Sequence, residues 1–308
     1  MSYRLEKTTL GNAWDDFIKA SWNGTLFSYS DYLGNIPHTP GVYYCYKNQE
    51  LRAAVVLLED EDNKITLIHG LVVHSGIIFG APTNNQNNAQ QTSEKFRISE
   101  FIANELPKIY DKINIKTDPK YQDIRSFLWV NYEKDAPKYK INIRYTSYLS
   151  IYDLSDISIL GENNTFQNIS ASRKQEIRYA QKKGVTTHEE FNINLFIEYY
   201  IKTFAHQNLE LGTQFNMDLQ IIKRLVLGLY EKKLGRMFIS YTQEGQAGSI
   251  AFFGVDHNRA YFLFGANNPD LRNEHTGTAV LWDSFRLLSG DGISEVDLEG
   301  INSPARGW

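Results

Sequence analysis

Strand-like and helix-like patterns of apolar positions alternate along the whole chain, which predicts a mixed α/β (α+β) fold. Near the start, residues 12–21 show helical spacing, with Trp14, Phe17 and Ile18 on one face. Short polar turns then separate several strand-like runs, and a polar loop leads into a second helical pattern. The elements expected here are strands over 42–47, 52–59 and 64–70, an apolar stretch over 71–79, a loop over 83–92, a helix over 93–111 and a strand over 113–116.

The second half of the chain repeats this order of elements. The copies share order and length rather than sequence, and meanders followed by a helix are common in unrelated proteins. We interpret the pattern as a tandem repeat in which each copy forms a mainly antiparallel mixed sheet flanked by helices. The second copy is expected to contain strands over 236–242, 247–256 and 259–266, a loop over 267–276, a helix over 277–289 and a strand over 293–298.

A mostly helical stretch separates the two copies. It is expected to contain helices over 118–132, 168–183, 192–206 and 216–233, and a strand over 139–151. The chain has 308 residues, which suits two domains of roughly 150 residues each. We therefore predict an N-terminal domain over 1–154 and a C-terminal domain over 155–308.

Composition narrows the class of protein without naming a ligand. Apolar residues make up 42% and charged residues 22% of the chain, as in ordinary globular proteins. The net charge of −4 argues against a general nucleic-acid coat, and we expect no DNA partner. Cys45 is the sole cysteine, which fits a reducing compartment. No signal-like segment and no run of about 18 apolar residues is present, so we expect a cytoplasmic protein without a membrane span.

The most informative chemistry lies where the loop of the second copy meets its helix. Gly277, Thr278 and Ala279 open a strongly apolar helix, and Arg272 lies just before them. A helix start presents unpaired backbone N–H groups and partial positive charge, and glycine lets a phosphate approach the backbone. The competing interpretation is a plain helix start with a glycine near its cap. The corresponding loop of the first copy, 83–92, contains no glycine, so we expect one phosphate site per chain.

This junction resembles the phosphate loop of the GNAT acyltransferase superfamily, in which Gln/Arg-x-x-Gly-x-Gly/Ala holds the pyrophosphate of coenzyme A. Gly277-Thr278-Ala279 matches the end of that pattern, whereas Glu274 stands where Gln or Arg is usual and Arg272 is near enough to supply the charge. The resemblance implies that acyl-CoA is bound in the C-terminal domain and not in the N-terminal one. The expected cofactor-binding residues are Gly265, Ala266, Arg272, Gly277, Thr278 and Ala279.

Two GNAT-like copies in one chain resemble the Fem-type branch of the superfamily. Other segments similar to that branch are Trp14-Asp-Asp-Phe, Thr25-Leu-Phe-Ser, His69-Gly-Leu-Val-Val-His-Ser, Asp123-Ile-Arg-Ser-Phe-Leu-Trp, 173–184 and Asp297-Leu-Glu-Gly-Ile-Asn-Ser-Pro.

The resemblance to the Fem-type branch leaves three functions to weigh. It implies either an N-acyltransferase acting on a nucleotide-linked amino sugar, such as a dTDP-amino-dideoxyhexose for O-antigen or another surface polysaccharide, or an aminoacyl-tRNA-dependent peptidoglycan transferase. The partial coenzyme A loop, the short chain and the mildly acidic charge favour the first, with tRNA a partner only in the second. A third interpretation is a degenerate pair of GNAT copies that only binds.

Transfer of an acyl group to an amine requires a base, orientation and donors for the oxyanion, without a covalent intermediate. Asp297 and Glu299 are two apart on a predicted strand and are expected to share a face. Either carboxylate, or His206, is a candidate base; sheet-end solvation is the plainer role for the carboxylates. His74 and His275 are candidates on the same ground as His206, since neutral imidazole suits the task. No pair of histidines has metal-ligand spacing, so we expect no metal. Cys45 falls in a predicted core strand and is not expected to carry the acyl group.

Basic residues crowd the predicted helix over 168–183. Lys174, Arg178 and Lys182 are four apart and are expected to share one face, with Arg173 beside them. A solvated helix face is the plainer interpretation. The alternative is that Arg173, Arg178 and Lys182 bind a diphosphate of the acceptor.

Overall fold

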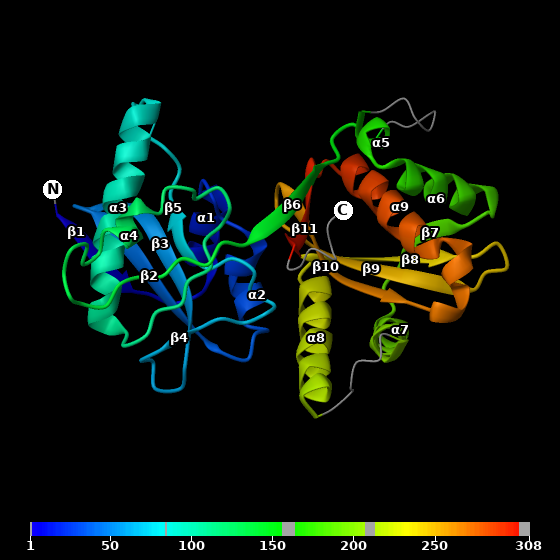
Figure 1. Cartoon of the computed structure of the whole chain (residues 1–308), viewed down its shortest axis with the longest axis horizontal. Coiled ribbons are helices and arrows are strands. Elements are labelled where there is room, and N and C mark those ends of the chain that lie inside the picture. The colour runs from blue at the N-terminus through cyan, green and yellow to red at the C-terminus, as the bar shows by residue number, and fades with distance from the viewer. Residues whose placement is uncertain (1, 84, 156–163, 207–212, 302–308) are drawn as a thin grey trace. The chain divides into compact units, whose positions relative to one another are not determined.

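The computed structural model describes residues 2–83, 85–155, 164–206 and 213–301. It divides the chain into two compact units, Met1–Ile143 and Arg144–Trp308 (Figure 1). Each unit contains a sheet flanked by helices, so the expected α/β (α+β) class is confirmed. None of the helices within the described ranges is long and apolar enough to cross a membrane.

The N-terminal unit is built on an antiparallel sheet with strand order β1-β2-β3-β4, in which β5 also pairs with β3. Helices α1 and α2 lie on one face of this sheet, and α3 and α4 on the other. The elements of the sheet and its helices are β1 (Tyr3–Lys7), α1 (Asn12–Ala20), α2 (Ser30–Leu33), β2 (Thr39–Lys47), β3 (Glu50–Glu59), β4 (Thr66–Leu67), β5 (Gly76–Phe79), α3 (Asn88–Ile109) and α4 (Arg125–Leu128).

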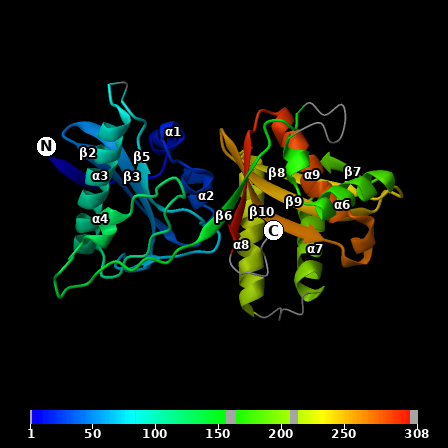
Figure 2. The ribbon, with the colours of Figure 1, turned by 45° about the horizontal axis from the view of Figure 1, so that its top comes forward.

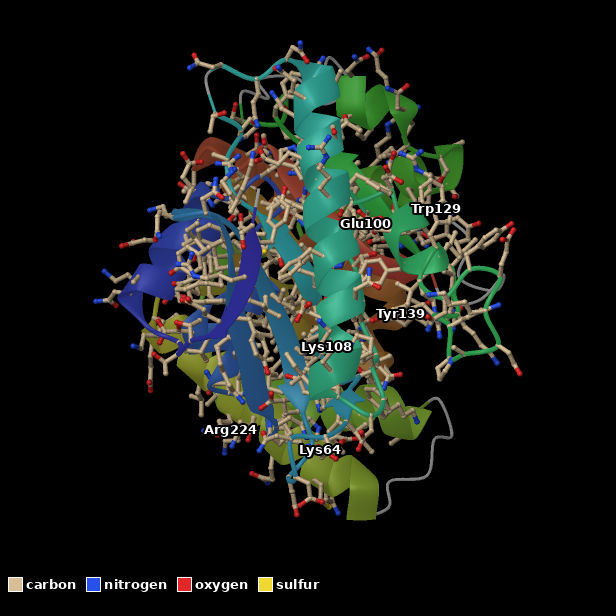
Figure 3. All side chains as sticks on the ribbon, turned by 90° about the vertical axis from the view of Figure 1, so that its left-hand side faces the viewer. Lys64, Glu100, Lys108, Trp129, Tyr139 and Arg224 are labelled. Carbon is tan, nitrogen blue, oxygen red and sulfur yellow. The ribbon has the colours of Figure 1, made fainter. Side chains whose placement is uncertain are left out.

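The core of this unit forms where α3 packs on the sheet. Ile98, Ile102 and Leu106 recur every four residues on α3 and are buried against strand residues such as Cys45 and Val55. Figure 3 looks at α3 from outside and shows Glu100 and Lys108 along its length, with Tyr139 beside it. The phenol of Tyr139 donates to the carbonyl of Ala103 at 3.0 Å, which fixes the extended segment after α4 against α3.

The C-terminal unit contains a six-stranded sheet with order β6-β11-β10-β9-β8-β7, in which β10 and β11 are the parallel pair (Figure 2). Helices α5, α6 and α9 cover one face, and α7 and α8 cover the other. The elements of this unit are β6 (Tyr145–Ser150), α5 (Asn164–Asn168), α6 (Ala171–Lys182), β7 (Thr186–Glu189), α7 (Ile193–His206), α8 (Thr213–Glu231), β8 (Gly235–Tyr241), β9 (Ala247–Val255), β10 (Arg259–Asn267), α9 (Thr276–Gly290) and β11 (Glu295–Ile301).

The two units repeat the same order of strands, as expected from the sequence. In each, antiparallel strands lead to one long helix, and the segment after that helix returns parallel to the strand before it. In the first unit the parallel pairing after the helix consists of a single bridge, between Ile65 and Lys112. Its third strand is also broken into β4 and β5, both of which pair with β3.

Several local expectations differ from the structure, among them the strand expected over 64–70, which is only β4, and the strand expected over 113–116, which does not form. The helix expected over 118–132 is the short α4, Arg125–Leu128, and the strand expected over 139–151 is only β6. Helix α3 begins five residues earlier than expected, because Asn87 and Gln90 form a capping box that starts it.

The division between the units also falls earlier than the expected boundary at 154/155. Strand β6 pairs antiparallel with β11, for example Leu149 with Val296, and so it completes the sheet of the C-terminal unit. Pairing between residues so far apart in the sequence leaves no local signal, which is why the sequence pattern places residues 144–154 in the first domain.

Candidate functional site

The parallel strands β10 and β11 pair over only three residues before they part. Their register joins Arg259 to Glu295, Ala260 to Val296 and Tyr261 to Asp297. Beyond these pairs β10 continues to Asn267 and β11 to Ile301 without further pairing to each other, and a bulge interrupts β10 against β9 at the same point. Ligands of α/β sheets bind beyond the carboxyl ends of parallel strands where neighbouring strands separate. This part of the sheet is therefore the first candidate for a functional site.

The chain leaves β10 through a short 3-10 turn, Pro269–Glu274, and enters α9 with an uncapped start. His275 is the N-cap residue, with a left-handed φ of 58° and no capping hydrogen bond from its side chain. The first backbone bond into the helix runs from Ala279 N to His275 O at 3.1 Å. Among the described residues, the N–H groups of Thr276, Gly277 and Thr278 have no acceptor. These three donors and the helix dipole form a site suited to an anion.

Buried hydroxyl groups hold this helix start against the sheet. Thr276 Oγ1 lies 2.9 Å from Ser249 Oγ, and Ser240 Oγ donates to the carbonyl of Thr276 at 3.0 Å. A Cβ atom on Gly248 would lie 2.4 Å from Thr276 Cγ2, so only glycine allows the helix to approach β9 this closely. Sequence reasoning missed Ser240, Gly248 and Ser249. The run of small residues that opens β9 was a signal for Gly248 and Ser249 only, since Ser240 lies on β8.

The residues expected to bind coenzyme A lie around this helix start. Gly277 has room for a Cβ, since such an atom would have Asn267 Oδ1 as its nearest neighbour at 3.4 Å. Ala279 is buried, and Arg272 is exposed without a side-chain partner in the described part of the chain. Gly265 and Ala266 lie on β10 beyond the point where it leaves β11, paired with β9.

Helix α6 crosses the start of α9 and engages several of its groups. Thr278 Oγ1 donates to Glu176 Oε2 at 2.6 Å, so the hydroxyl expected to face a phosphate is held by a carboxylate. The hydrogen bond from Thr278 and the neighbouring Arg173 outweigh burial and hold the pKa of Glu176 below its ordinary value. Glu274, the departure from the family pattern, accepts from Lys183 Nζ at 3.1 Å.

The basic residues of α6 do not form one uniform face. Arg173 pairs with Glu176 at 2.5 Å, and Lys174 Nζ donates to the carbonyl of Gln167. The guanidinium of Arg178 lies 5.6 Å from the ring centroid of Phe166. Lys182 is exposed. The shared face expected from spacing is thus divided, because Lys174 and Arg178 turn toward the residues that precede the helix.

Asp297 lies at the point where β10 and β11 separate, and it is fully buried. Its Oδ1 accepts from Thr146 Oγ1 at 2.6 Å and from the backbone N–H of Glu299 at 2.8 Å. Glu299 has a left-handed φ of 60° within a bulge of β11 against β6. The bulge interrupts the alternation of side chains, so the argument that Asp297 and Glu299 share a face by spacing was wrong. A hydrogen bond through the backbone links the two residues instead.

Further polar side chains gather beside Asp297. Tyr261, its partner in the register, donates to Asp256 Oδ2 at 2.6 Å, and burial raises the pKa of its phenol well above the ordinary value. Arg259 donates to Glu295 at 2.7 Å in the first pair of the register. These bonds fix both strands directly before they part.

The remaining candidates lie elsewhere. The side chain of His206 and the end of the Asp297 segment, 302–304, are outside the described residues. His275 is the N-cap residue of α9 without capping it, and its ring centroid lies 5.5 Å from that of Tyr179; His74 is buried in the N-terminal unit. Burial raises the pKa of Cys45 to about 12, which keeps its thiol protonated. Within the ranges that the structure describes, no cluster of three His, Cys, Asp or Glu side chains is arranged to hold a metal.

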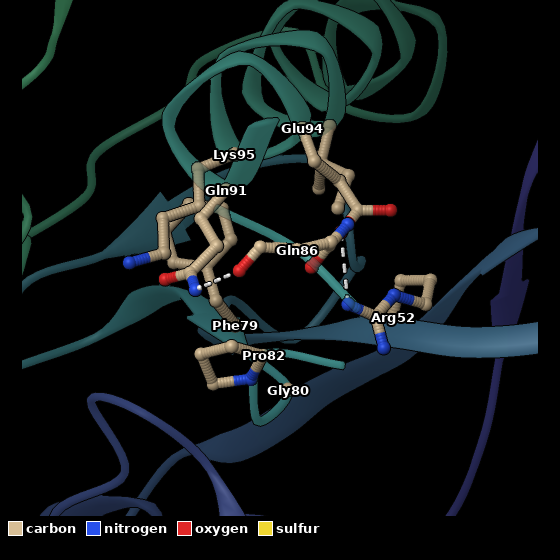
Figure 4. A pocket seen from close by; sticks show the side chains of 9 residues that line it. Arg52, Phe79, Gly80, Pro82, Gln86, Gln91, Glu94 and Lys95 are labelled. Carbon is tan, nitrogen blue, oxygen red and sulfur yellow. Dashed lines mark hydrogen bonds and ion pairs between the residues drawn. The ribbon is translucent and has the colours of Figure 1, made fainter. Parts of the chain in front are cut away.

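In the N-terminal unit, side chains occupy the position that corresponds to the start of α9. In the second copy Asn268 N donates to Gly248 O, and in the first copy Gly80 N donates to Arg52 O, both at 2.8 Å. Arg52 of the first copy thus stands where the second copy has Gly248. Its guanidinium pairs with Glu94 of α3 (Figure 4). Asn87 in turn caps α3 with its own side chain. In the first copy a side chain thus engages one backbone N–H of the helix start, that of Gln90, whereas none of the three N–H groups that open α9 has such a partner among the described residues.

Comparison with known proteins agrees with this arrangement. Residues 170–305 match the family model described as acetyltransferase (GNAT) domain. FemX has a TM-score of 0.67 and 13% identity, covering 98% of this chain and 90% of its own. A protein of unknown function from Bacteroides thetaiotaomicron has a TM-score of 0.52 and 9% identity, covering 96% and 90%. L-PGS from Bacillus licheniformis has a TM-score of 0.50 and 11% identity, covering 96% and 79%. No curated protein sequence matches the chain.

Proposed function

We propose that this chain, an acyltransferase of the GNAT superfamily with the tandem fold of the Fem-type branch, moves an acyl group from acyl-CoA to the amino group of a nucleotide-linked amino sugar. The reaction is placed in the cytoplasm and supplies a modified sugar for surface polysaccharide. The donor is bound by the C-terminal unit alone.

The observation that carries the proposal is the row of unengaged N–H groups at Thr276, Gly277 and Thr278, which follow the end of β10 that has separated from β11. Backbone donors and the helix dipole suit the pyrophosphate of coenzyme A. Arg272, exposed and unpaired among the described residues, adds a positive charge. The pantetheine arm would then follow the edge of β10 at Gly265 and Ala266 toward Asp297.

Chemistry at the parted strands needs no covalent enzyme intermediate. The amine of the acceptor loses a proton and attacks the thioester carbonyl, so that a C–N bond forms and the C–S bond breaks. The proton passes to a carboxylate, and the coenzyme A thiolate leaves and is protonated. We assign the base to Glu299, whose side chain is half-buried, and the positioning role to Asp297, which is fully buried and holds the backbone of Glu299.

The acceptor carries a diphosphate in this proposal, for which Arg173, Arg178 and Lys182 of α6 supply positive charge. The plainer role of a solvated face competes for these three residues, because Arg173 is already paired with Glu176. Charge reversal of Arg178 is expected to raise the KM of the nucleotide sugar and leave that of acyl-CoA unchanged.

An aminoacyl-tRNA-dependent peptidoglycan transferase is the alternative, because a tandem fold shared with FemX at 13% identity does not decide the donor. One assay separates the two functions. The chain is incubated with acetyl-CoA or another short acyl-CoA and a panel of amino-sugar nucleotides, and free thiol is followed. Acceptor-dependent thiol release is the expected result. Transfer from charged tRNA without thiol release would establish the alternative instead.

A further inference from the structure

A recess in the N-terminal unit gathers more positive than negative charge. It lies between β3, the end of β5 and the first three turns of α3 (Figure 4). Its enclosed volume is about 10 Å³, which is room for one water-sized group, and the empty space is about 240 Å³ when the open solvent at its mouth is included. The recess therefore suits one oxygen atom of a ligand, with the rest of the ligand outside it.

Arg52 lines this recess with a guanidinium that is largely unengaged. Its side chain is 10% exposed, and Nη2 donates to Glu94 Oε2 at 2.8 Å. Among the described residues, Nη1 and the buried Nε have no acceptor. A guanidinium carries five N–H donors in a fork that matches carboxylate and phosphate groups. A buried donor without an acceptor is destabilising, so this arrangement favours an added acceptor.

Lys95 follows Glu94 on α3 and also lines the recess. In the described part of the chain its ammonium has no carboxylate partner. Its Nζ lies 3.1 Å from the ring centroid of Trp22, and burial lowers the pKa of the ammonium. An aromatic face attracts a cation but does not neutralise its charge. A half-buried ammonium held in this way remains able to pair with an anion.

The charges around the recess do not balance. Glu94 is the one carboxylate that lines it, and pairing with Lys47 at 2.7 Å and Arg52 at 2.8 Å outweighs burial and lowers its pKa to about 2. Glu94 is thus ionised and balances one positive charge out of three, those of Lys47, Arg52 and Lys95. The two unbalanced charges lie in a half-buried site, where screening by water is weaker than at an open surface.

We propose that this recess binds a small oxyanion, a phosphate or carboxylate group, between Arg52 and Lys95. The rings of Phe79 and Pro82 supply an apolar wall against which the group that carries the anion packs. The site is independent of the proposed acyl transfer. It lies at the position that corresponds to the start of α9, so the two copies bind anions by different means: side-chain cations in the first and backbone N–H groups in the second.

Titration of the full chain with inorganic phosphate, and separately with acetate, tests this site, with sodium chloride at matched ionic strength as the blank. Binding is followed by tryptophan fluorescence, and the same titration of Trp22→Phe identifies the ring that reports. A saturable change is expected in the wild-type chain. Lys95→Gln should weaken binding at least about tenfold, because it removes a charged hydrogen bond. Lys108→Gln, on the same helix but outside the recess, is the matched control.

The proposal is overturned if phosphate and acetate both act like chloride, or if Lys95→Gln and Lys108→Gln bind as the wild type does. A larger response to phosphate assigns a phosphate group, and a larger response to acetate assigns a carboxylate. Arg52→Lys keeps the positive charge beside Glu94 but removes the forked N–H donors of the guanidinium. It should therefore weaken anion binding while the thermal stability of the fold is retained. Acyl-CoA affinity measured on Lys95→Gln should not change, which separates this site from the one at α9.

Discussion

At the scale of single residues, the point where β10 and β11 part concentrates the chemistry. Asp297 is buried there, accepts two hydrogen bonds through Oδ1, and sets the left-handed backbone of Glu299. The sequence predicted that both carboxylates belong to this strand. It did not predict the bulge that relates them, because the bulge depends on pairing with β6 from the other end of the domain.

Glu299→Gln is expected to lower kcat by about 10²–10⁴-fold, the usual contribution of a general base, and to leave the Kd of acyl-CoA unchanged. Steady-state kinetics with saturating acyl-CoA measure the effect. Glu295→Gln, on the same strand but paired with Arg259, is the matched control and should retain most of the activity. A Glu299→Gln enzyme with the wild-type kcat would remove this residue from the mechanism.

Glu94 is expected to contribute stability that depends on pH. Its pKa is about 2 in the folded chain against 4.5 in the unfolded chain, so the contribution is complete above about pH 4.5 and is lost as the pH falls toward 2. Glu94→Gln should lower the free energy of unfolding at pH 7 by about 3 kcal/mol, since it leaves two cations without their partner. Urea unfolding at pH 7 and pH 3 checks this. A destabilisation of equal size at both pH values would contradict it.

At the scale of elements, the start of α9 differs from the start of α3 for identifiable reasons. The glycine and small residues that open α9 were visible in the sequence, and so was the absence of glycine from the corresponding loop. The support beneath α9 was not visible, since Ser240, Gly248 and Ser249 come from two earlier strands. Long-range contacts of this kind determine the site, whereas local patterns determined the order of the elements.

Gly248→Val is expected to push the first turn of α9 away from β9, because its Cβ would lie 2.4 Å from Thr276 Cγ2. Overpacking of this kind costs about 1–3 kcal/mol, and the Kd of acyl-CoA should rise with it. Thermal unfolding and calorimetric titration measure the two effects. Gly290→Val, at the other end of α9 with no atom within 4 Å of its added Cβ, is the control. Equal effects of the two substitutions would argue against a special role for Gly248.

At the scale of the whole molecule, the chain contains two units of one design, of which the second has the free helix start. The repeat was predicted from the order of strands and helices, and the structure confirms it. The division at residue 143 was not predicted, because β6 joins a sheet whose other strands lie after residue 185.

Fragments of the chain test this division. A fragment over 144–308 retains β6 beside β11 and is expected to fold with a cooperative thermal transition. A fragment over 155–308 loses that strand and exposes the edge of β11, so its transition should be at lower temperature or absent. Circular dichroism during heating distinguishes them. Identical transitions would show that β6 contributes nothing to the C-terminal unit.

Calorimetric titration of a short acyl-CoA into three proteins tests whether acyl-CoA binds at the uncapped start of α9. The wild-type chain and Gly290→Leu, a leucine at the far end of the same helix, are expected to bind one acyl-CoA per chain with the same affinity. Gly277→Leu should lose binding, because a bulky side chain in the first turn of α9 crowds the place where the proposed pyrophosphate contacts the three free N–H groups. Unchanged affinity in Gly277→Leu, or no binding by the wild-type chain, would contradict the account.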